Sequence, residues 1–531
     1  MGVKSSVAFP IKPLFLSWLL VLISLSLILK SGLYSDDVIT FQTRKSAGPI
    51  SFIQVTNNAI SEIKDCAQAG RFTPITYLLH CYLFWIVNTI LAYKIIILFF
   101  NLLAVLSFTQ MLRSFELDGW IPLVLILFCA SAQFFVRYHD PFTSLHAMYP
   151  LLAVFIFSSI SYFAQYLKNG KATILAGSVL MTVLATLQSE IGFVLYPVLM
   201  VLLSNDDRPI SFKSKAFLPF IILLALNATL FLFLRRDSSH MYSGVQTNLD
   251  PAKMFDVAYF QLVSAIPMTG YAYMSNIGGF FAREFSKTYP FLILSIIVVI
   301  SIIKSSNPDQ YKKLDTLRRR DILGVGLILL VLPACILMMS KKYQGELDYG
   351  RGYLPVYIQD FGFVLLMLAF FDFLFVKFRN RKKTILTLGF SLVFLVGQLT
   401  FMRNDYLIGQ MNSERSTPSD FLYKSLKNGI LNSCEKGSVI VFGSNYFYPT
   451  PVYYQTIVDN FYNTHLRVIL KEDFNGKNIK NDGAYYLLEH DNTGQFTTLY
   501  RLSSNEKKMV RRINYPIGDE FSYFDLISKP L

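Results

Sequence analysis

Two adjacent carboxylates, Asp36 and Asp37, follow the first hydrophobic run of the chain, in the stretch GLYSDDVITFQTR at residues 32–44. A carboxylate at a membrane surface could take the proton from an attacking hydroxyl group, and general-base catalysis of this kind contributes about 10²- to 10⁴-fold in rate. Because neighbouring side chains in an extended loop point in opposite directions, we expect only one of the two acids to be the base. We favour Asp37, with Asp36 in a supporting role; the ordinary alternative is a solvated loop or a helix cap.

Further ionisable and polar side chains stand where hydrophobic segments end. Glu190 in QSEIGF interrupts a long apolar stretch, and an acid near the membrane is costly unless it has a partner or lines a cavity. Arg351 in DYGRGYLP carries a planar guanidinium that could hold a phosphate through two parallel hydrogen bonds. Taken singly, each such residue has a structural alternative, such as a turn or a contact with a lipid phosphate. The complete set of predicted substrate-binding residues is Arg351, Arg71, Arg44, Asp140, Glu190, His139 and Tyr353.

Composition places most of the chain in a membrane. Hydrophobic residues make up 53% of the 531 residues, charged residues make up 16%, and the mean hydropathy is +0.42. The hydrophobic fraction and the mean hydropathy lie above those of an ordinary soluble domain, and the charged fraction lies below. At about 20 apolar residues per span, about eleven segments qualify as membrane-spanning helices, near residues 13–30, 94–112, 120–137, 147–167, 172–187, 191–203, 216–234, 289–303, 322–340, 356–376 and 384–402.

Two further apolar segments need a separate interpretation. The first, LFLSWLLVLISLSLIL, is longer than the hydrophobic region of a signal peptide and precedes no small-residue cleavage site, so we expect a retained helix. The second, ITYLLHCYLFWIVNTIL at residues 75–91, contains His, Tyr, Trp and Asn side chains that suit a membrane surface. We expect it to lie on the membrane surface. If it crossed the membrane, every later basic loop would be on the extracytoplasmic side, against the usual excess of Lys and Arg in cytoplasmic loops.

Basic residues predict the orientation of the chain. Lys and Arg collect in the loops 204–217, 304–321 and 377–383, and an excess of these residues is typical of short cytoplasmic loops. Residues 31–93, 235–288, 341–355 and the C-terminal tail are then on the opposite side. The net charge of +14 reflects this topology. Nucleic-acid binding is disfavoured, because the basic runs flank hydrophobic spans instead of forming a groove with interleaved aromatic side chains.

Residues 403–531 mix polar and apolar residues, unlike the long apolar runs before them, and predict a small α/β domain. GSVIVFG, LRVIL, GAYYLLEH and FTTLYRL read as strands, and VYYQTIVDNFY at 452–462 reads as a helix. No glycine-rich phosphate fingerprint follows the first strand, so binding or support is the expected role. The five cysteines are scattered without metal-binding spacing and indicate neither a disulfide framework nor zinc.

Several of these segments resemble a known class. The stretches SDDVITFQTR and AGRFTPITYLL resemble the first loop of bacterial glucosyltransferases that modify O-antigen, and HDPF resembles a stretch of the lipid A aminoarabinose transferases. Together with RGYLP before a late span, they are similar to the GT-C class of polyprenyl-phosphate-sugar glycosyltransferases over roughly residues 10–380. Two departures stand out: Glu190 takes the place of a basic residue common in lipid A transferases, and Arg71 stands near where some relatives carry metal-binding acids. No cofactor is therefore expected, with a divalent metal left as an option.

The resemblance implies a fold and an activity. The expected fold is an α-helical polytopic membrane protein with a GT-C-like transmembrane catalytic domain at 1–402, its first external loop at 31–93, and an extracytoplasmic α/β domain at 403–531. The expected enzyme is an inverting hexosyltransferase of the bacterial inner membrane. It would move a sugar, glucose in the first instance, from a polyprenyl-phosphate donor to an envelope glycan such as O-antigen. The alternatives are a transporter or flippase of lipid-linked saccharides, and a ligase that uses the same carrier.

Overall fold

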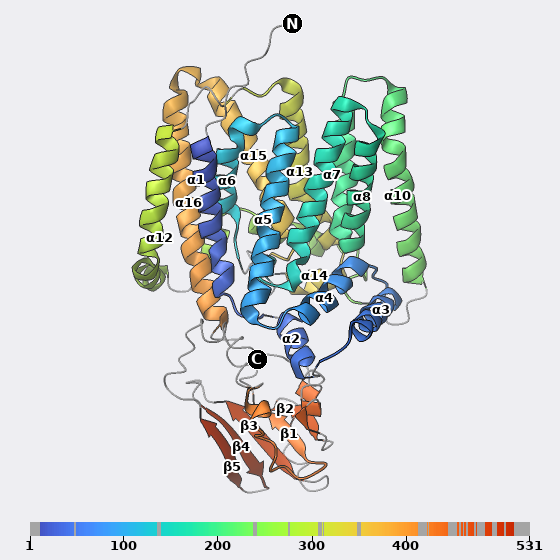
Figure 1. Cartoon of the computed structure of the whole chain (residues 1–531), viewed down its shortest axis with the longest axis vertical. Helices are drawn as coiled ribbons and strands as arrows, with labels where there is room; N and C mark the ends of the chain where they lie inside the picture. The colour runs from blue at the N-terminus through green and yellow to red at the C-terminus, as the bar shows by residue number, and fades with distance from the viewer. Residues whose placement is uncertain are drawn as a thin grey trace. The chain divides into compact units, whose positions relative to one another are not determined.

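The computed structural model divides the chain into two compact units, which are described separately (Figure 1). Unit 1 comprises Met1–Leu29, Asn57–His80 and Ile96–Leu407, and unit 2 comprises Lys30–Thr56, Cys81–Ile95 and Ile408–Leu531. The structure describes residues 11–34, 36–46, 49–134, 140–236, 242–273, 277–305, 311, 313–347, 352–412, 422, 424–443, 454–455, 458–459, 461–462, 466–471, 474, 484–490, 496–503 and 506–514.

Long apolar helices dominate the described residues. Eight of them are long and apolar enough to cross a membrane. The chain is therefore a helical, polytopic membrane protein. The helices concerned are α1 (Ile11–Leu25) with its extension η1 (Ser26–Lys30), α5 (Ile90–Ser114), α7 (Met148–Asn169), α10 (Ile210–Arg236), α12 (Ile277–Ser305), α13 (Thr316–Met338), α15 (Val356–Lys377) and α16 (Lys382–Met411).

Three further segments that were expected to cross are shorter helices. The segments predicted near 120–137, 172–187 and 191–203 coincide with α6 (Ile121–Ser131), α8 (Ala172–Gln188) and α9 (Leu195–Ser204). The expected number of about eleven spans thus stays a prediction. The segment expected on the membrane surface contains α4 (Pro74–Ile86), which has 13 residues. The remaining α-helices are α2 (Asp36–Ser46), α3 (Phe52–Gln68), α11 (Pro251–Ser264) and α14 (Lys341–Glu346).

Close backbone contact and aromatic packing form the core of unit 1. Helices α13 and α15 meet at Gly326 and Gly362, and a Cβ atom on Gly362 would fall 2.6 Å from the backbone nitrogen of Leu330. The ring of Phe361 on α15 lies 4.9 Å from that of Phe108 and 4.8 Å from that of Phe157, between centroids. Such edge-on and offset aromatic contacts add to the free energy of burial. This core fixes the helices that carry the polar residues described below.

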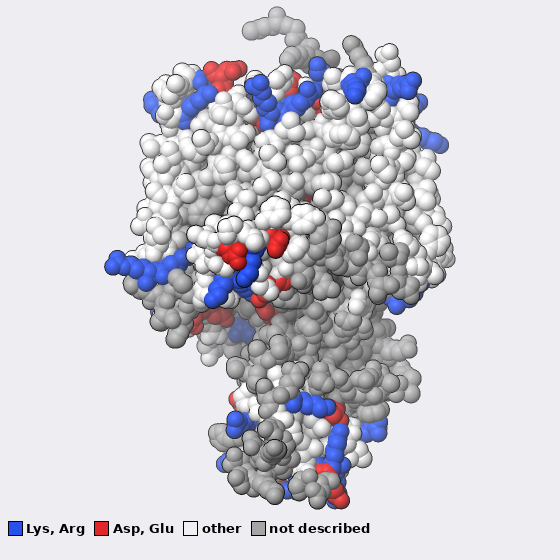
Figure 2. All heavy atoms as spheres, turned by 180° about the vertical axis from the view of Figure 1, so that it is seen from behind, with Lys and Arg blue, Asp and Glu red and all other residues white. Residues whose placement is uncertain are grey.

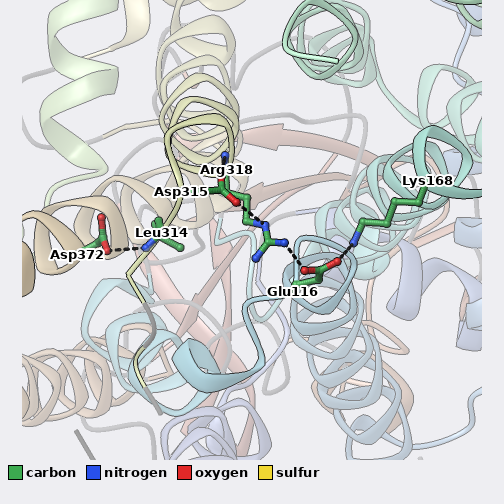
Figure 3. A network of polar contacts seen from close by, with 6 residues as sticks. All are labelled: Glu116, Lys168, Leu314, Asp315, Arg318 and Asp372. Atoms are coloured by element: carbon green, nitrogen blue, oxygen red, sulfur yellow. Dashed lines mark hydrogen bonds and ion pairs between the residues drawn. The ribbon is translucent and has the colours of Figure 1, made fainter. Parts of the chain in front are cut away.

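Basic residues gather at one end of unit 1. The ends of α12 and α15 and the starts of α10, α13 and α16 lie there (Figure 1), and the face in Figure 2 shows Lys and Arg along this end above a band without charged side chains. An ion network ties the end together (Figure 3): Glu116 accepts from Lys168 at 2.8 Å and from Arg318. Nearby, buried Asp372 accepts from the backbone nitrogen of Leu314 at 3.0 Å. The loops expected to be cytoplasmic therefore share one end of the bundle.

Unit 2 contains a five-stranded sheet near the C-terminus. The strands are β1 (Val439–Phe442), β2 (Arg467–Leu470), β3 (Tyr485–His490), β4 (Phe496–Leu502) and β5 (Lys507–Asn514), in the order β2-β1-β3-β4-β5. Strand β1 runs parallel to β2 and β3, whereas β3, β4 and β5 are antiparallel. The four strands expected from the sequence are confirmed, and β5 was not expected. Within 452–462, the described residues Tyr454, Gln455, Val458, Asp459 and Phe461 are helical.

Candidate functional site

Arg71 owes its position to the way α3 ends. Gly70 takes the left-handed conformation with φ of 84°, which glycine adopts without a steric penalty. The Arg71 backbone nitrogen then donates to the carbonyl of Cys66 at 2.9 Å, and that of Gly70 donates to Ala67 at 3.0 Å. This pattern closes the helix in the manner of a Schellman motif. The AGRF segment is therefore a rigid helix end that presents the guanidinium.

Glu190 is held by a break between two apolar helices. Helix α8 ends at Gln188, the side chain of Ser189 accepts from the Ile191 backbone nitrogen at 3.3 Å, and Glu190 begins the short helix η4 (Glu190–Val194). Two residues on, a Cβ atom at Gly192 would fall 2.5 Å from the carbonyl oxygen of Ala185. Only glycine therefore fits the reversal that places this carboxylate.

The structure brings Arg71 and Glu190 together from segments far apart in the sequence. The Arg71 Nε atom lies 3.7 Å from the Glu190 Oε1 atom, and the two side chains are 27% and 23% exposed. Burial by itself lowers the pKa of Arg71, but the Glu190 carboxylate, followed by the phenols of Tyr77 and Tyr343, raises that pKa above its ordinary value. Arg71 is thus a permanent cation beside a carboxylate.

Tyrosine and lysine side chains surround this ion pair. The Arg71 guanidinium lies 5.9 Å from the ring centroid of Tyr242, and the Tyr242 hydroxyl accepts from the Lys342 ammonium at 2.8 Å. The rings of Tyr343 and Tyr353 are 4.5 Å apart between centroids. Helix α14, which carries Lys342 and Tyr343, lies at the end of unit 1 opposite the basic loops (Figure 1). We call these residues the arginine–tyrosine cluster: Arg71, Glu190, Tyr242, Lys342, Tyr343 and Tyr353.

Backbone hydrogen bonds fix Tyr353 in this cluster. The side chain of Gln261 accepts from the Tyr353 backbone nitrogen at 2.6 Å and donates to its carbonyl oxygen at 3.1 Å. Burial raises the pKa of the Tyr353 hydroxyl well above its ordinary value. For Lys342, burial lowers the pKa, but the phenols of Tyr353 and Tyr242 raise it overall. At neutral pH the cluster therefore contains two cations, Arg71 and Lys342, beside the Glu190 carboxylate.

Within the cluster, and two residues along the chain from Arg71 and from Glu190, lie buried side-chain oxygens that have no hydrogen-bond partner. These are Thr73 Oγ1, Gln188 Oε1 and Glu190 Oε1. Gln188 is fully buried; its side-chain amide nitrogen donates to the backbone carbonyl of Met148 at 3.2 Å, and its backbone carbonyl accepts from Thr76 Oγ1 at 2.7 Å. Buried polar atoms are normally paired, and one that is not invites an explanation. A ligand rich in hydroxyl groups would supply the missing donors.

The backbone that leads into α7 is strained. Three consecutive residues, Leu145, His146 and Ala147, take the left-handed conformation with φ of 58°, 54° and 58°. Each such residue costs about 1–2 kcal/mol in comparison with the right-handed conformation. Buried His146 packs edge-on against His80 with 4.1 Å between ring centroids. Strain of this kind concentrates at functional sites, which supports a role for this region of unit 1.

Asp140 begins the turn before this strained segment. Its carboxylate accepts from the Phe142 backbone nitrogen at 3.1 Å and from the Thr143 hydroxyl, and its carbonyl oxygen accepts from the Ser144 hydroxyl at 2.6 Å. Asp140 is fully buried. These contacts define an Asx-type turn, so Asp140 shapes the loop whatever else it does.

The two acids of the first loop begin α2 and have different surroundings. Asp36 is exposed, whereas Asp37 is fully buried and accepts from the Tyr93 hydroxyl at 2.5 Å. Close to Tyr93, the buried Lys94 ammonium lies 5.4 Å from the ring centroid of Tyr34. All of these residues belong to unit 2. The pair is therefore part of a helix start, and the extended loop expected from the sequence is wrong at these positions.

The remaining site residues expected from the sequence divide into two groups. Arg44 lies on α2 in unit 2 and is partly exposed. Arg351 and His139 lie outside the described residues. The sequence interpretation missed Lys342, Tyr343, Tyr242 and Gln261. Of these, only Lys342 and Tyr343 gave a signal, since KKYQGELDYG directly precedes the RGYLP motif.

Comparisons with known proteins assign no family. No family model matches the chain, and a search of the curated proteins finds no match. Among the described residues, no group of three or more His, Cys, Asp or Glu side chains is arranged to hold a metal ion. The chemistry of the site therefore has to be argued from the arginine–tyrosine cluster itself.

Proposed function

We propose that this protein is an integral-membrane glycosyltransferase that transfers a sugar from a polyprenyl-phosphate donor to a glycan of the cell envelope. One observation carries the proposal: Arg71, Glu190 and Tyr353, which were expected to bind substrate, lie in one cluster with Lys342 and with unpaired acceptor atoms. Cations suit a phosphate, acceptors suit sugar hydroxyls, and tyrosine rings suit the apolar face of a sugar.

In this proposal, Arg71 and Lys342 bind the donor phosphate. A hydroxyl oxygen of the acceptor attacks the anomeric carbon, the bond from that carbon to the phosphate oxygen breaks, and polyprenyl phosphate leaves with the electron pair. The transition state has oxocarbenium character, and fixed cations stabilise the charge that develops on the leaving group. A carboxylate takes the hydroxyl proton. Attack opposite the leaving group inverts the anomeric configuration.

The resemblance described above implies a base in the first loop, Asp37 first and Asp36 second; both lie in unit 2, and their role is a separate proposal that does not use the geometry of the arginine–tyrosine cluster. Within unit 1, Glu190 is the corresponding candidate, because its side chain is partly exposed and its Oε1 atom, which lies 3.7 Å from Arg71 Nε, accepts no hydrogen bond. The orientation in the proposal follows the basic residues at one end of unit 1, which are expected to face the cytoplasm. The arginine–tyrosine cluster would then work on the extracytoplasmic side of a bacterial inner membrane.

A second candidate function, transport of a lipid-linked saccharide, rests on Asp360. This acid is 1% exposed, lies in the second turn of α15, and has no hydrogen bond to either carboxylate oxygen. Ionisable residues inside membrane helices often mark ion or substrate pathways. The cluster with two cations at the end of the bundle favours transfer over transport.

The two functions differ in their products. Purified protein would be incubated separately with polyprenyl-phosphate glucose, mannose and galactose together with an envelope glycan. We expect one donor to be consumed, with release of polyprenyl phosphate and gain of one hexose by the acceptor. Movement of an intact lipid-linked sugar across vesicles, without cleavage of any donor, would favour transport instead.

A further inference from the structure

A second arginine of unit 1, Arg403, carries a buried charge with few hydrogen bonds and no ion-pair partner among the described residues. The side chain is on α16 and is 6% exposed. Its Nη1 atom donates to the carbonyl oxygen of Phe134 at 3.1 Å, and its buried Nε atom has no hydrogen-bond acceptor. Removing a guanidinium from water is expensive unless it is paired. The Nε atom of this guanidinium therefore lacks an acceptor among the described residues.

The described surroundings of Arg403 do not supply that acceptor. Two acidic groups act on it electrostatically, Tyr271 and Asp140. The Tyr271 hydroxyl donates to the Leu399 carbonyl at 2.5 Å, and the Asp140 carboxylate accepts from Phe142 and Thr143. Among the described residues, no carboxylate lies within ion-pair distance of Arg403.

A glycine lets the backbone approach this guanidinium. A Cβ atom on Gly270 would fall 2.4 Å from Cζ, Nε and Nη2 of Arg403. Close by, Met268 has a φ of 75°, which is uncommon for a residue other than glycine. The backbone of the loop at Gly270 therefore packs directly against the guanidinium of Arg403.

The depth of Arg403 along its helix indicates the membrane surface. At 1.5 Å per residue, Arg403 is about 32 Å from Lys382 at the basic end of α16. The hydrocarbon layer of a bilayer is about 30 Å thick. Arg403 therefore lies at about the level of the head groups in the leaflet opposite the basic loops.

We propose that Arg403 is the centre of an anion site that binds the phosphate group of a membrane lipid. A phosphate oxygen is the strongest acceptor available at this depth, and arginine holds it with directed hydrogen bonds. Two sources share this chemistry: a phosphorylated polyprenyl carrier and an ordinary phospholipid. The inference does not depend on sugar transfer, because it concerns binding alone.

The test measures binding to the full chain in detergent by thermal shift. The probes are farnesyl phosphate, farnesol, inorganic phosphate and a short-chain phosphatidylglycerol. For the wild-type protein we expect stabilisation by farnesyl phosphate and none by farnesol. The Arg403→Gln variant should raise the apparent Kd for the phosphate probe by roughly 10- to 100-fold, as expected for loss of a hydrogen bond to a charged group. Arg283→Gln is the matched control, since Arg283 is 55% exposed and pairs with Glu284.

The outcomes separate the sources and the alternatives. An equal, Arg403-dependent shift with phosphatidylglycerol assigns the site to bulk phospholipid, and a shift with farnesyl phosphate alone assigns it to a carrier. If Arg403→Gln does not fold, Arg403→Lys is measured instead, and it should lose most of the affinity because it loses the fork. Unchanged binding in a folded Arg403 variant, or no binding of either phosphorylated lipid to the wild type, would overturn the site. Loss of sugar transfer with intact binding would contradict only the proposed function.

Discussion

At the scale of single residues, substitution of the buried Asp37 and of its exposed neighbour Asp36 should affect turnover to different extents. Asn in place of the base keeps size but cannot take a proton, so Asp37→Asn should lower turnover by about 10²-fold or more with donor binding retained. Asp36→Asn should lower it much less. Turnover per folded protein is measured in membranes at matched expression.

A control separates catalysis from support of the fold. Tyr93→Phe removes the hydroxyl that donates to Asp37, while it leaves the carboxylate in place. If Asp37→Asn and Tyr93→Phe both reduce only the amount of folded protein, Asp37 has a structural role, and Glu190 becomes the base to test.

The pKa shifts in the arginine–tyrosine cluster predict how donor binding depends on pH. The pKa of Lys342 lies above its ordinary value, which is about 10.4, so its charge is present below that pH and is lost only as pH rises further. Donor affinity should therefore be flat between about pH 6 and pH 9. In Lys342→His, the charge is present at low pH and is lost as pH rises, so affinity should fall between about pH 6 and pH 8. A flat profile in that variant would remove Lys342 from the phosphate site.

Single residues with unusual chemistry were recognisable from the sequence, but their partners were not. Glu190 stood out because it interrupts an apolar stretch, and its partner Arg71 was named as well. That they pair, and that Lys342 and Tyr242 join them, depends on packing between distant helices. Arg403 gave no signal, because RND after an apolar run reads as the ordinary end of a membrane span.

At the scale of elements, the break between α8 and η4 should be sensitive to a single methyl group. In Gly192→Ala the added Cβ would meet the Ala185 carbonyl oxygen at 2.5 Å, so the variant should lose about 1–3 kcal/mol of stability and displace Glu190. Gly345→Ala on α14 is the control, because nothing lies within 4 Å of its added Cβ. The measurement compares thermal midpoints and donor affinities. Equal values for both variants would show that the break tolerates a side chain.

Elements with a strong pattern were predictable, and weakly patterned ones were not. Eight long helices and four strands coincide with expected segments, because their apolar runs are long or bounded by turn residues. Strand β5 was missed, because KKMVRRIN mixes charged and apolar residues without a clean period of two. The start of α2 was expected as loop, because DDVITFQTRKS is polar on average and begins with two acids.

At the scale of the whole molecule, the basic end of unit 1 predicts the topology. A phosphatase that works only outside the cytoplasm should be active when fused after Leu531 and inactive when fused at Lys383. This expectation follows from the basic residues at the start of α16 and from α16 itself, which among the described residues is the one membrane-length apolar helix between the two positions. The reverse pattern would place the arginine–tyrosine cluster in the cytoplasm and remove the extracytoplasmic mechanism.

The most direct test of the account is sugar transfer by the purified protein and by charge variants of its central pair. Radiolabelled hexose is followed from the polyprenyl-phosphate donor to an envelope glycan, with wild type, Arg71→Gln, Glu190→Gln and the exposed control Arg283→Gln compared at equal folded concentration. We predict transfer by the wild type and the control, with kcat/KM reduced by about 10²-fold or more in Arg71→Gln, as expected when a charge-assisted contact to the leaving group is lost. Absence of transfer with every hexose donor, or equal rates in wild type and Arg71→Gln, would contradict the account.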